Sequence, residues 1–490
     1  MKTRTFLICL TLLLPACTSA NIPLPADEVQ DGGSITEAQP SPPAAASTTS
    51  EPDLTVTIGA PTGESIRPLL GINAGPVPIE ADGADLTAAY QEIGVTLIRT
   101  HDFCGPLDMA TMYPDQNADP YNPASYDFSA SDQVFAAILG GGFEPYLRLG
   151  DSYGSANGFP PARPRAPVNP EHWVLAAVEV VRHYHELAEE AGIPLRYVEI
   201  WNEPDLSQFW DGSQQEFFSL FDQTAHALKN EFPTLLIGGP GLTQASALAT
   251  PESHPGRLTS GQGQEYTRAF LDYLQSRQTP IDFFSWHMYS NNPKDFVKAA
   301  QFYRTELDTR GFTQVPLHNT EWNTALNTDN QAATEEFGLG GHGAAILTAS
   351  WIAMQQEGIA EVTLYRGSSP SNRIGLGIFF ADGQPKRAAL VFSLWAELVQ
   401  HPQWLRLTLD GDDPGLWLLA GQAETGEIAI LIANPTEQSV VVQMILPDGR
   451  IAQPAAMKTV SDANDGIEES VPDVLIDIPA YSVQLIEINP

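Results

Sequence analysis

Residues 198–205 read Val-Glu-Ile-Trp-Asn-Glu-Pro-Asp, and this stretch decides the fold prediction for the whole chain. It begins as an apolar and aromatic run, becomes polar at Asn202 and Glu203, and stops at Pro204. Such a run predicts a buried strand, and a proline directly after it prevents further strand pairing. We therefore predict that this strand delivers Asn202 and Glu203 to the mouth of a barrel.

A second glutamate stands in a similar setting. Residues 315–323 read Val-Pro-Leu-His-Asn-Thr-Glu-Trp-Asn, which places Glu321 at the end of another short apolar run. Retaining glycoside hydrolysis requires two such carboxylates, one as acid/base and one as nucleophile. We predict Glu203 and Glu321 as this catalytic pair, with carboxyl groups about 5–5.5 Å apart.

Apolar runs alternate with helical stretches between residues 67 and 399. The strand-like runs cover 69–72, 96–101, 144–149, 197–201, 235–239, 281–286, 315–320 and 361–365. Amphipathic helical stretches at 172–191, 214–231, 264–278, 294–308 and 343–357 fall between several of them. This alternation predicts an α/β fold, a (β/α)8 TIM barrel, whose active site lies at the C-terminal ends of the strands. Glu203 and Glu321 close the fourth and seventh runs.

The pattern changes at about residue 400. Short strand-like runs follow one another, separated by Gly, Pro, Asp and Asn, which predicts a C-terminal antiparallel β-sandwich over 400–490. Residues 53–66 also read as a strand, and we expect that strand to be able to join the sandwich.

The N-terminus reads as a targeting segment rather than as structure. Lys2 and Arg4 precede a short apolar stretch that ends in Leu-Pro-Ala-Cys at 14–17. This resembles a bacterial lipobox, in which Cys17 becomes the lipidated first residue after residues 1–17 have acted as signal. The alternative is an ordinary cleaved secretory signal. Residues 18–52, rich in Pro, Ser and Thr, read as a disordered linker. We expect a lipid-anchored protein of the bacterial cell envelope, at the outer membrane or cell surface, or else a secreted one.

Charge and cysteine content exclude several classes. The chain of 490 residues carries a formal net charge of −36, which argues against nucleic acid or an anionic membrane as an electrostatic partner. Contact with a membrane is expected only through the lipid anchor. Besides Cys9 and Cys17 the chain has only Cys104, so one mature chain can form no disulfide framework. No metal-ligand spacing appears among the ten histidines and no phosphate-binding glycine loop appears, so we predict neither metal nor cofactor.

Polar residues at the other strand ends complete the predicted site. Arg99 is the candidate cation that keeps the nucleophile ionised, because a buried arginine needs a carboxylate partner. Tyr289 is placed to hydrogen-bond Glu321. The residues predicted to contact sugar hydroxyls or rings are Asn202, His101, Asp102, His287, Tyr289 and Trp322. For His287 a structural role in the core is the alternative, and for the tryptophans near the mouth it is barrel packing.

These motifs resemble those of clan A of the retaining glycoside hydrolases. The Trp-Asn-Glu-Pro at 201–204 and the Thr-Glu-Trp-Asn at 320–323 are most similar to family 39, which contains β-xylosidases and α-L-iduronidases. Supporting stretches are Tyr-Asp-Phe-Ser at 126–129, Pro-Tyr-Leu-Arg-Leu-Gly at 145–150 and Trp-His-Met-Tyr at 286–289. The resemblance covers roughly residues 65–490. It implies Glu203 as acid/base and Glu321 as nucleophile, with Asn202, His287 and Tyr289 in support.

The chain departs from the xylosidases of that family at three strand ends. It has Arg-Thr-His-Asp at 99–102 in place of Arg-Phe-His-Gly, Arg148 in place of a glutamate, and Tyr365-Arg366 without the tryptophan common across the clan. Two arginines at strand ends can bind a carboxylate bidentately. We therefore hypothesise that Arg148 and Arg366 bind an acidic sugar such as a uronic acid. The alternative is that they pair with Asp151 or another carboxylate.

Two other functions stay open at this point. One is an endoglycanase similar to family 5 that acts on a polymer through an open cleft. The other is an inactive, glycan-binding surface lipoprotein, which would have no need of either glutamate. In every case the expected partner is an oligosaccharide or polysaccharide. The sugar, the linkage and the oligomeric state are not set by these motifs.

Overall fold

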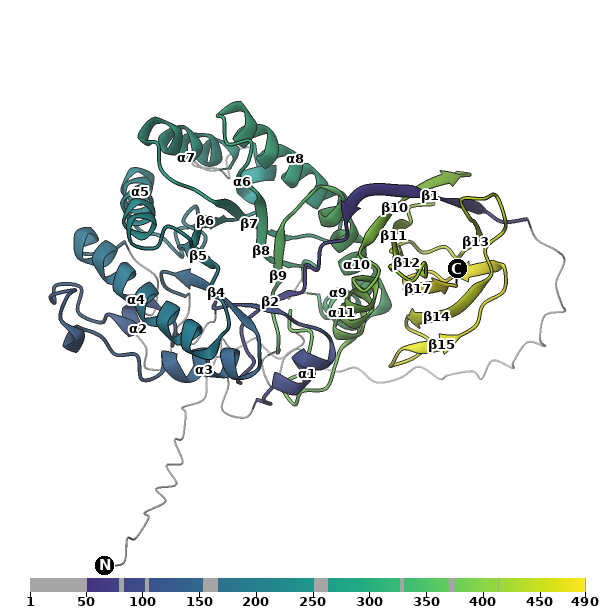
Figure 1. Ribbon diagram of the computed structural model, residues 1–490, viewed down its shortest axis with the longest axis horizontal. Coiled ribbons are helices and arrows are strands. Elements are labelled where there is room, and N and C mark those ends of the chain that lie inside the picture. Colours follow the sequence, from purple (N-terminus) through teal and green to yellow (C-terminus); the bar gives the residue numbers. More distant parts are fainter. Residues whose placement is uncertain are drawn as a thin grey trace, which may run out of the picture.

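The computed structural model describes residues 51–78, 83–101, 105–152, 166–250, 263–326, 330–369, 375–412 and 414–489. Two bodies lie side by side along the long axis of the molecule, a helix-covered barrel and a smaller body of strands (Figure 1). The sequence predicted both bodies, and the fold class is confirmed.

Eight parallel strands close the barrel in chain order, from β2 to β9, and β9 pairs back with β2. They are β2 (Gly71–Asn73), β3 (Leu97–Arg99), β4 (Glu144–Leu149), β5 (Tyr197–Ile200), β6 (Leu236–Leu242), β7 (Phe283–Tyr289), β8 (Leu317–Asn323) and β9 (Glu361–Leu364). Because all the strands run the same way, their C-terminal residues meet at one mouth.

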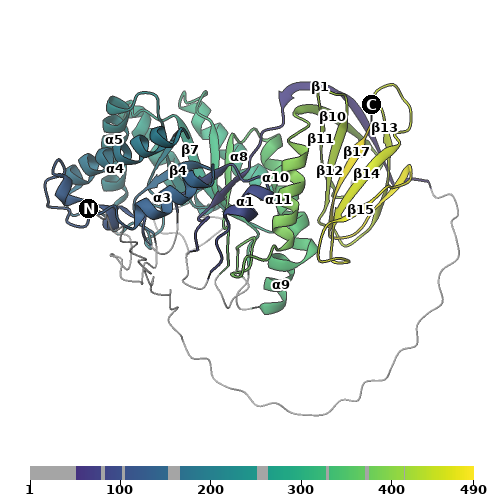
Figure 2. The same ribbon diagram turned by 60° about the horizontal axis from the view of Figure 1, so that its bottom comes forward.

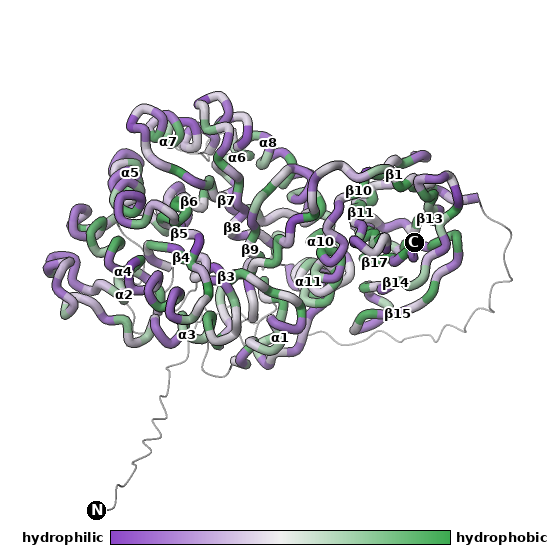
Figure 3. The backbone as a smooth tube through the Cα atoms, in the orientation of Figure 1, coloured by the Kyte–Doolittle hydropathy of each residue, from purple (hydrophilic) through white to green (hydrophobic). Residues whose placement is uncertain are grey.

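The helices lie outside the barrel and after it. They are α1 (Thr87–Glu92), α2 (Met109–Met112), α3 (Ser131–Gly140), α4 (Pro170–Ala191), α5 (Gln214–Glu231), α6 (Ala245–Leu248), α7 (Gln264–Arg277), α8 (Pro293–Thr309), α9 (Gln331–Leu339), α10 (Gly341–Gln356) and α11 (Arg387–Leu398), with a 3₁₀ turn at Pro123–Ser125. In Figure 3 outer helices such as α5 alternate between hydrophilic and hydrophobic colours, as expected of helices with one buried face. Among the described residues, no helix combines the length and apolarity that crossing a bilayer demands.

Local sequence fixes where the long helices begin. The side chain of Ser213 accepts a hydrogen bond from the Glu216 backbone, and the Glu216 carboxylate accepts one from the Ser213 backbone, which together form a capping box for α5. For α4, Asn169 caps the first turn, Pro170 takes the first helical position, and Gly192 ends the helix in the left-handed conformation.

The second body is one sheet of nine strands that folds around its own core. The strand order is β15-β14-β17-β12-β11-β10-β1-β13-β16. The strands are β1 (Leu54–Ser65), β10 (Gln403–Asp410), β11 (Trp417–Gln422), β12 (Ile428–Asn434), β13 (Val440–Ile445), β14 (Pro454–Val460), β15 (Glu468–Ser470), β16 (Leu475–Ile478) and β17 (Ser482–Ile488). Neighbours are antiparallel except β1 and β13, which pair parallel. The strand from before the barrel, β1, therefore completes the sheet.

Apolar side chains join the two bodies. Helices α10 and α11 lie between the barrel and the outer face of the sheet (Figure 2). The rings of Trp351 and Trp395, one from each helix, stack with centroids 4.7 Å apart. Leu431 and Leu485 of the sheet belong to the same buried cluster as the barrel core. Continuous burial of this kind holds the two bodies as one unit.

Candidate active site

Side chains inside the barrel form two layers. Near the N-terminal ends of the strands, Tyr146, Tyr197 and Phe283 pack against His318, whose ring stacks on Phe283 at 4.4 Å. This aromatic layer fills the lower part of the barrel. Two residues further along the same strands, the inward side chains become charged or polar. The predicted site therefore lies directly above a packed aromatic layer.

Arg99 of β3 is the centre of the polar layer. Its guanidinium, fully buried, donates to Glu199 at 2.6 Å, to Glu321 at 2.9 Å, to Asn202 at 2.8 Å and to Asn73 at 2.9 Å. Burial alone would lower the pKa of Arg99, but the two carboxylates outweigh it and the pKa lies above its ordinary value. A buried arginine that serves four partners holds them in fixed positions.

Glu321 receives its hydrogen bonds from two other strands, β3 and β7. Arg99 donates to Oε1 at 2.9 Å, and the Tyr289 hydroxyl donates to Oε2 at 2.8 Å. His101 Nε2 lies 3.4 Å from Oε1. The side chain is 6% exposed, so these contacts decide its orientation. A guanidinium and a phenol therefore hold the two carboxylate oxygens in fixed positions, and a positioned carboxylate is what nucleophilic attack requires.

Glu203 has a different environment. It follows β5 in a turn with a left-handed backbone, φ +49°, and its backbone N–H donates to the Gly241 carbonyl at 3.0 Å. Burial, and then the negative charge of Asp205, raise the pKa of Glu203 to about 8, although Arg99 acts in the opposite direction. Two carboxyl groups at one mouth therefore differ in surroundings, one paired with a cation and one desolvated, as an acid/base and a nucleophile must.

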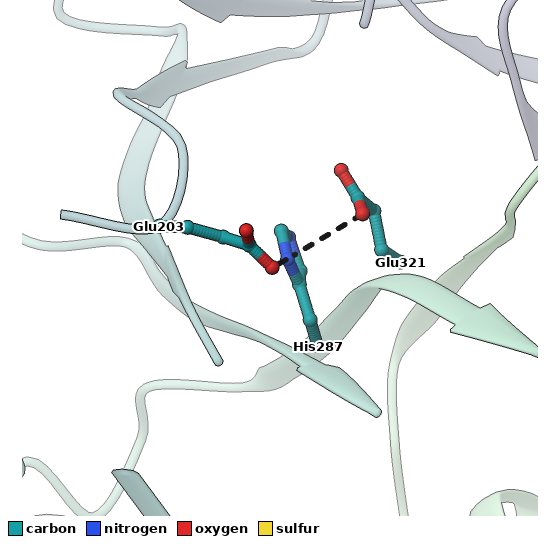
Figure 4. Close-up of side chains that lie close together, drawn as sticks. All are labelled: Glu203, His287 and Glu321. Atoms are coloured by element: carbon teal, nitrogen blue, oxygen red, sulfur yellow. Dashed lines mark hydrogen bonds and ion pairs between the residues drawn. The ribbon is translucent and has the colours of Figure 1, made fainter. Parts of the chain in front are cut away.

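His287 of β7 lies between the two glutamates (Figure 4). Its Nδ1 is 2.8 Å from Glu203 Oε1 and 3.7 Å from Glu321 Oε2. Burial lowers the pKa of His287 below its ordinary value despite the nearby Glu321. A neutral imidazole can accept a hydrogen bond at Nδ1 from the carboxyl O–H of Glu203, so this contact orients a protonated Glu203.

The two glutamates are close. One oxygen of each, together with His287 Nδ1, lie within 4.8 Å of one another. These three atoms could in principle hold a metal ion. However, Arg99 already bonds Glu321, and a second cation would have to approach against its charge. The geometry thus suits proton transfer by one carboxyl group and nucleophilic attack by the other better than it suits metal binding.

The structure overturns the expectation for Trp322. Its side chain is fully buried, and its ring packs outward against Trp351 at 5.4 Å and Phe296 at 6.2 Å. Successive strand residues point to opposite faces, so Trp322 must face the helices if Glu321 faces the interior. Trp201 and Trp286 also pack outward, against Trp173 and Tyr303 respectively. Barrel packing, the alternative reading for these tryptophans, is correct.

The predicted arginines take separate places. Arg148 of β4 is fully buried and donates to Asp108 Oδ1 at 2.9 Å and to Ser152 Oγ at 2.9 Å. Its charge is thus balanced within the protein, by a carboxylate other than Asp151. Arg366 follows β9, is 6% exposed, and donates from Nε to the Ser368 carbonyl at 2.8 Å. Asp102 and Cys17 lie outside the described residues.

Some residues of the site were missed from the sequence. Glu199 lies two residues before the Trp-Asn-Glu-Pro motif and is fully buried. It accepts hydrogen bonds from Arg99 at 2.6 Å and from the Thr320 hydroxyl at 2.8 Å. An acidic residue inside an apolar strand was the available signal. Asn73 donates to the Thr320 carbonyl at 2.9 Å and ties β2 into the network. Asp205 and Lys386 are also buried close to the site.

Comparison with known proteins agrees with this architecture. The family model described as glycosyl hydrolases family 39 matches residues 79–337. The curated β-xylosidase of Geobacillus stearothermophilus is 25% identical over 276 residues, and the match covers 50% of each chain. The chain thus spans about half the length of the curated relatives it matches.

Solved structures are similar over nearly the whole fold. A glucosidase from Croceicoccus marinus aligns with a TM-score of 0.69 at 22% identity, covering 89% of this chain and 99% of the other. A family 39 β-xylosidase from Caulobacter crescentus aligns with a TM-score of 0.64 at 19% identity, with the same coverage. At these identities the likeness shows the fold. Because the family model matches more than half of the residues, the chain belongs to glycosyl hydrolase family 39.

Proposed function

We propose that the protein is a retaining glycoside hydrolase in which Glu203 is the acid/base and Glu321 the nucleophile. The observation that carries this proposal is the approach of one oxygen of each glutamate to within 4.8 Å of the other. Inverting enzymes keep their carboxyl groups about 6.5–9.5 Å apart so that a water fits between, whereas retaining enzymes place them about 5–5.5 Å apart. The short separation supports direct attack on the sugar.

The surroundings of each group support its role. In the first step, Glu203 protonates the leaving glycosidic oxygen while Glu321 attacks the anomeric carbon. In the second step, Glu203 removes a proton from water, which displaces Glu321 from the sugar. A pKa of about 8 keeps Glu203 protonated at neutral pH, as the first step requires. Tyr289 and Arg99 keep Glu321 in place for attack.

Asn202 is positioned to bind the sugar 2-hydroxyl. Arg99 donates to its Oδ1, which fixes the plane of the amide. Its Nδ2 is buried and has no hydrogen-bond partner among the described residues. A buried donor without a partner is costly, and a sugar hydroxyl at this position would satisfy it. Such a contact strengthens in the transition state of retaining hydrolysis.

The substrate class has two candidates. The similarity to β-xylosidases supports a β-xyloside. The second candidate, an acidic sugar, is supported by Lys386, which is 3% exposed and donates to Ser369 Oγ at 2.5 Å and to the Gly375 carbonyl at 3.0 Å, both neutral partners. Burial and the charge of Arg366 lower the pKa of Lys386 to about 8. Two buried cations in range of each other would be stabilised by a carboxylate.

Hydrolysis of aryl glycosides tests the proposal. The panel contains xylosides, glucosides, galactosides, arabinosides and uronides, with Glu321→Gly as the inactive control. Turnover that disappears in the variant supports the catalytic pair, and equal turnover of uronides and neutral sugars removes the acidic-sugar candidate. Activity on polysaccharide alone would instead indicate the endoglycanase, and no activity on either would indicate a binding protein.

We also propose that the mature chain is attached to the cell envelope through a lipid on Cys17. The support is the Leu-Pro-Ala-Cys sequence at 14–17 after a short basic and apolar segment. Two or more acyl chains suffice for stable anchoring. Incorporation of radiolabelled palmitate into the wild type, and its loss in Cys17→Ser, tests this proposal. Equal release of both proteins into the medium would contradict it.

A further inference from the structure

Asp205, two residues after Glu203, carries a buried negative charge with an unusual set of partners. Its side chain is 9% exposed. It accepts hydrogen bonds from the Thr243 backbone N–H at 3.2 Å, from Thr243 Oγ1 at 2.5 Å and from Ser246 Oγ at 2.7 Å. In the described part of the chain these partners are all neutral donors. A carboxylate satisfied only by dipoles keeps its full charge, and that charge acts on its neighbours.

The same contacts form a mechanical link. Glu203 and Asp205 share the turn that follows β5, in which the Leu206 N–H donates to the Glu203 carbonyl. Thr243 directly follows β6, and Ser246 belongs to α6. Asp205 therefore ties the turn that carries Glu203 to the end of the next strand, beside the bond from Glu203 N–H to the Gly241 carbonyl.

We propose that Asp205 is a positioning residue for the reaction, which clamps the turn that carries Glu203 and holds a fixed negative charge in that turn, two residues from Glu203. This inference rests on the proposed function of Glu203. Without the charge of Asp205, Glu203 would face burial and Arg99 alone, and it would release its proton at lower pH. The function of Asp205 is then to keep Glu203 protonated up to a higher pH than burial alone would allow.

Other charged and titratable groups also face Glu203. They are His287 and Tyr289 from β7, Glu321 from β8, Arg99 from β3 and Tyr365 after β9. His287 has a lowered pKa and is neutral in the range of interest. Burial raises the pKa of both tyrosines well above their ordinary value. His287 and the two tyrosines therefore do not change charge in the range where Glu203 titrates.

The test compares three variants. Asp205→Asn removes the charge but keeps the shape, and the hydroxyls of Thr243 and Ser246 can rotate to accept from the new amide. Ser246→Ala weakens the clamp and keeps the charge. Asp222→Asn is a matched control: Asp222 is 5% exposed and also accepts from a threonine hydroxyl, Thr279, but lies on α5 outside the barrel.

The readout is the proton on Glu203 itself. Protein labelled with ¹³C at the glutamate carboxyl carbon is titrated by NMR, and the Glu203 resonance is identified by its loss in Glu203→Gln. We expect the midpoint to fall by about 0.5–1 pH unit in Asp205→Asn, and to stay in place in Ser246→Ala and in the control. An unchanged midpoint in Asp205→Asn, or an equal fall in Ser246→Ala, overturns the inference.

A fourth variant and a kinetic measurement complete the test. If Asp205→Asn does not fold, Asp205→Glu retains the charge, and a lowered midpoint there overturns the inference just as clearly. The pH profile of kcat/KM is measured in parallel, and its basic limb should move with the NMR midpoint. Because the NMR titration needs no turnover, an inactive protein would refute the proposed function and still report on Asp205.

Discussion

The raised pKa of Glu203 predicts a change in protein stability that needs no substrate to measure. The folded protein holds the proton of Glu203 up to about pH 8, whereas the unfolded chain releases it near 4.5. The folded state therefore binds more protons in this window, and its stability falls as the pH rises. The contribution of the protonated carboxyl is complete below about 4.5 and is lost as the pH passes 8.

The magnitude follows from these two values. Each pH unit between them corresponds to about 1.36 kcal/mol. From pH 5 to pH 8 the loss in the wild type is therefore about 3–4 kcal/mol, a little less than three full units because each state is partly titrated at one end of the range. Glutamine has no proton to release and avoids this loss. Relative to the wild type, Glu203→Gln should thus gain about 3–4 kcal/mol in free energy of unfolding between pH 5 and pH 8.

Urea unfolding followed by tryptophan fluorescence measures this difference, since most tryptophans lie in the barrel and on its helices. Other titrating groups are common to both proteins and cancel in the comparison. Glu265→Gln, an exposed glutamate on α7, serves as a control and should track the wild type at both pH values. If Glu203→Gln differs from the wild type by the same amount at pH 5 and pH 8, Glu203 is not the desolvated acid described above.

Three further substitutions test the network around the two glutamates. Arg99→Met leaves Glu199 buried without its cation and should cost about 3–5 kcal/mol of stability, seen as a lower Tm; an unchanged Tm would mean that water replaces the arginine. Tyr289→Phe removes the hydroxyl on Glu321 and should lower kcat by roughly 10–100-fold with the Tm nearly unchanged; equal losses in both would indicate a structural role only. Trp322→Ala should cost about 3–5 kcal/mol and leave KM unaffected, whereas a selective rise in KM would return Trp322 to the sugar site.

The fold could be predicted from the sequence because the alternation of apolar and amphipathic segments can be recognised within each short stretch of the chain. Eight apolar runs separated by amphipathic stretches specify a barrel without knowledge of any contact. The two glutamates of the proposed catalytic pair could be placed together for the same reason, since both end strands of one parallel sheet, and such ends meet at one mouth. Arg99 followed from the cost of a buried charge, and the structure shows it bonded to Glu321.

The contacts that the sequence could not predict have physical causes as well. Trp322 was assigned to the sugar although it follows Glu321 directly, and strand alternation alone would have turned it outward. The partner of Arg148 is Asp108, which lies far from it in sequence and whose proximity only the tertiary fold creates. Lys386 lies after the last barrel strand in a stretch without regular period, where a buried lysine has no sequence signature.

The tryptophan of the Trp-Asn-Glu-Pro motif explains how the protein maintains a strained backbone at Glu203. Trp201 has φ +79° and Glu203 has φ +49°, conformations that cost about 1–3 kcal/mol each in residues with side chains. Trp201 is fully buried outside the barrel, against Trp173 at 5.6 Å and Trp210 at 5.1 Å, and its Nε1 donates to the Phe209 carbonyl. Burial of a whole indole stabilises by more than the strain of one residue. Trp201 therefore serves the proposed chemistry from the far side of the strand, because its packing fixes the turn that presents Glu203.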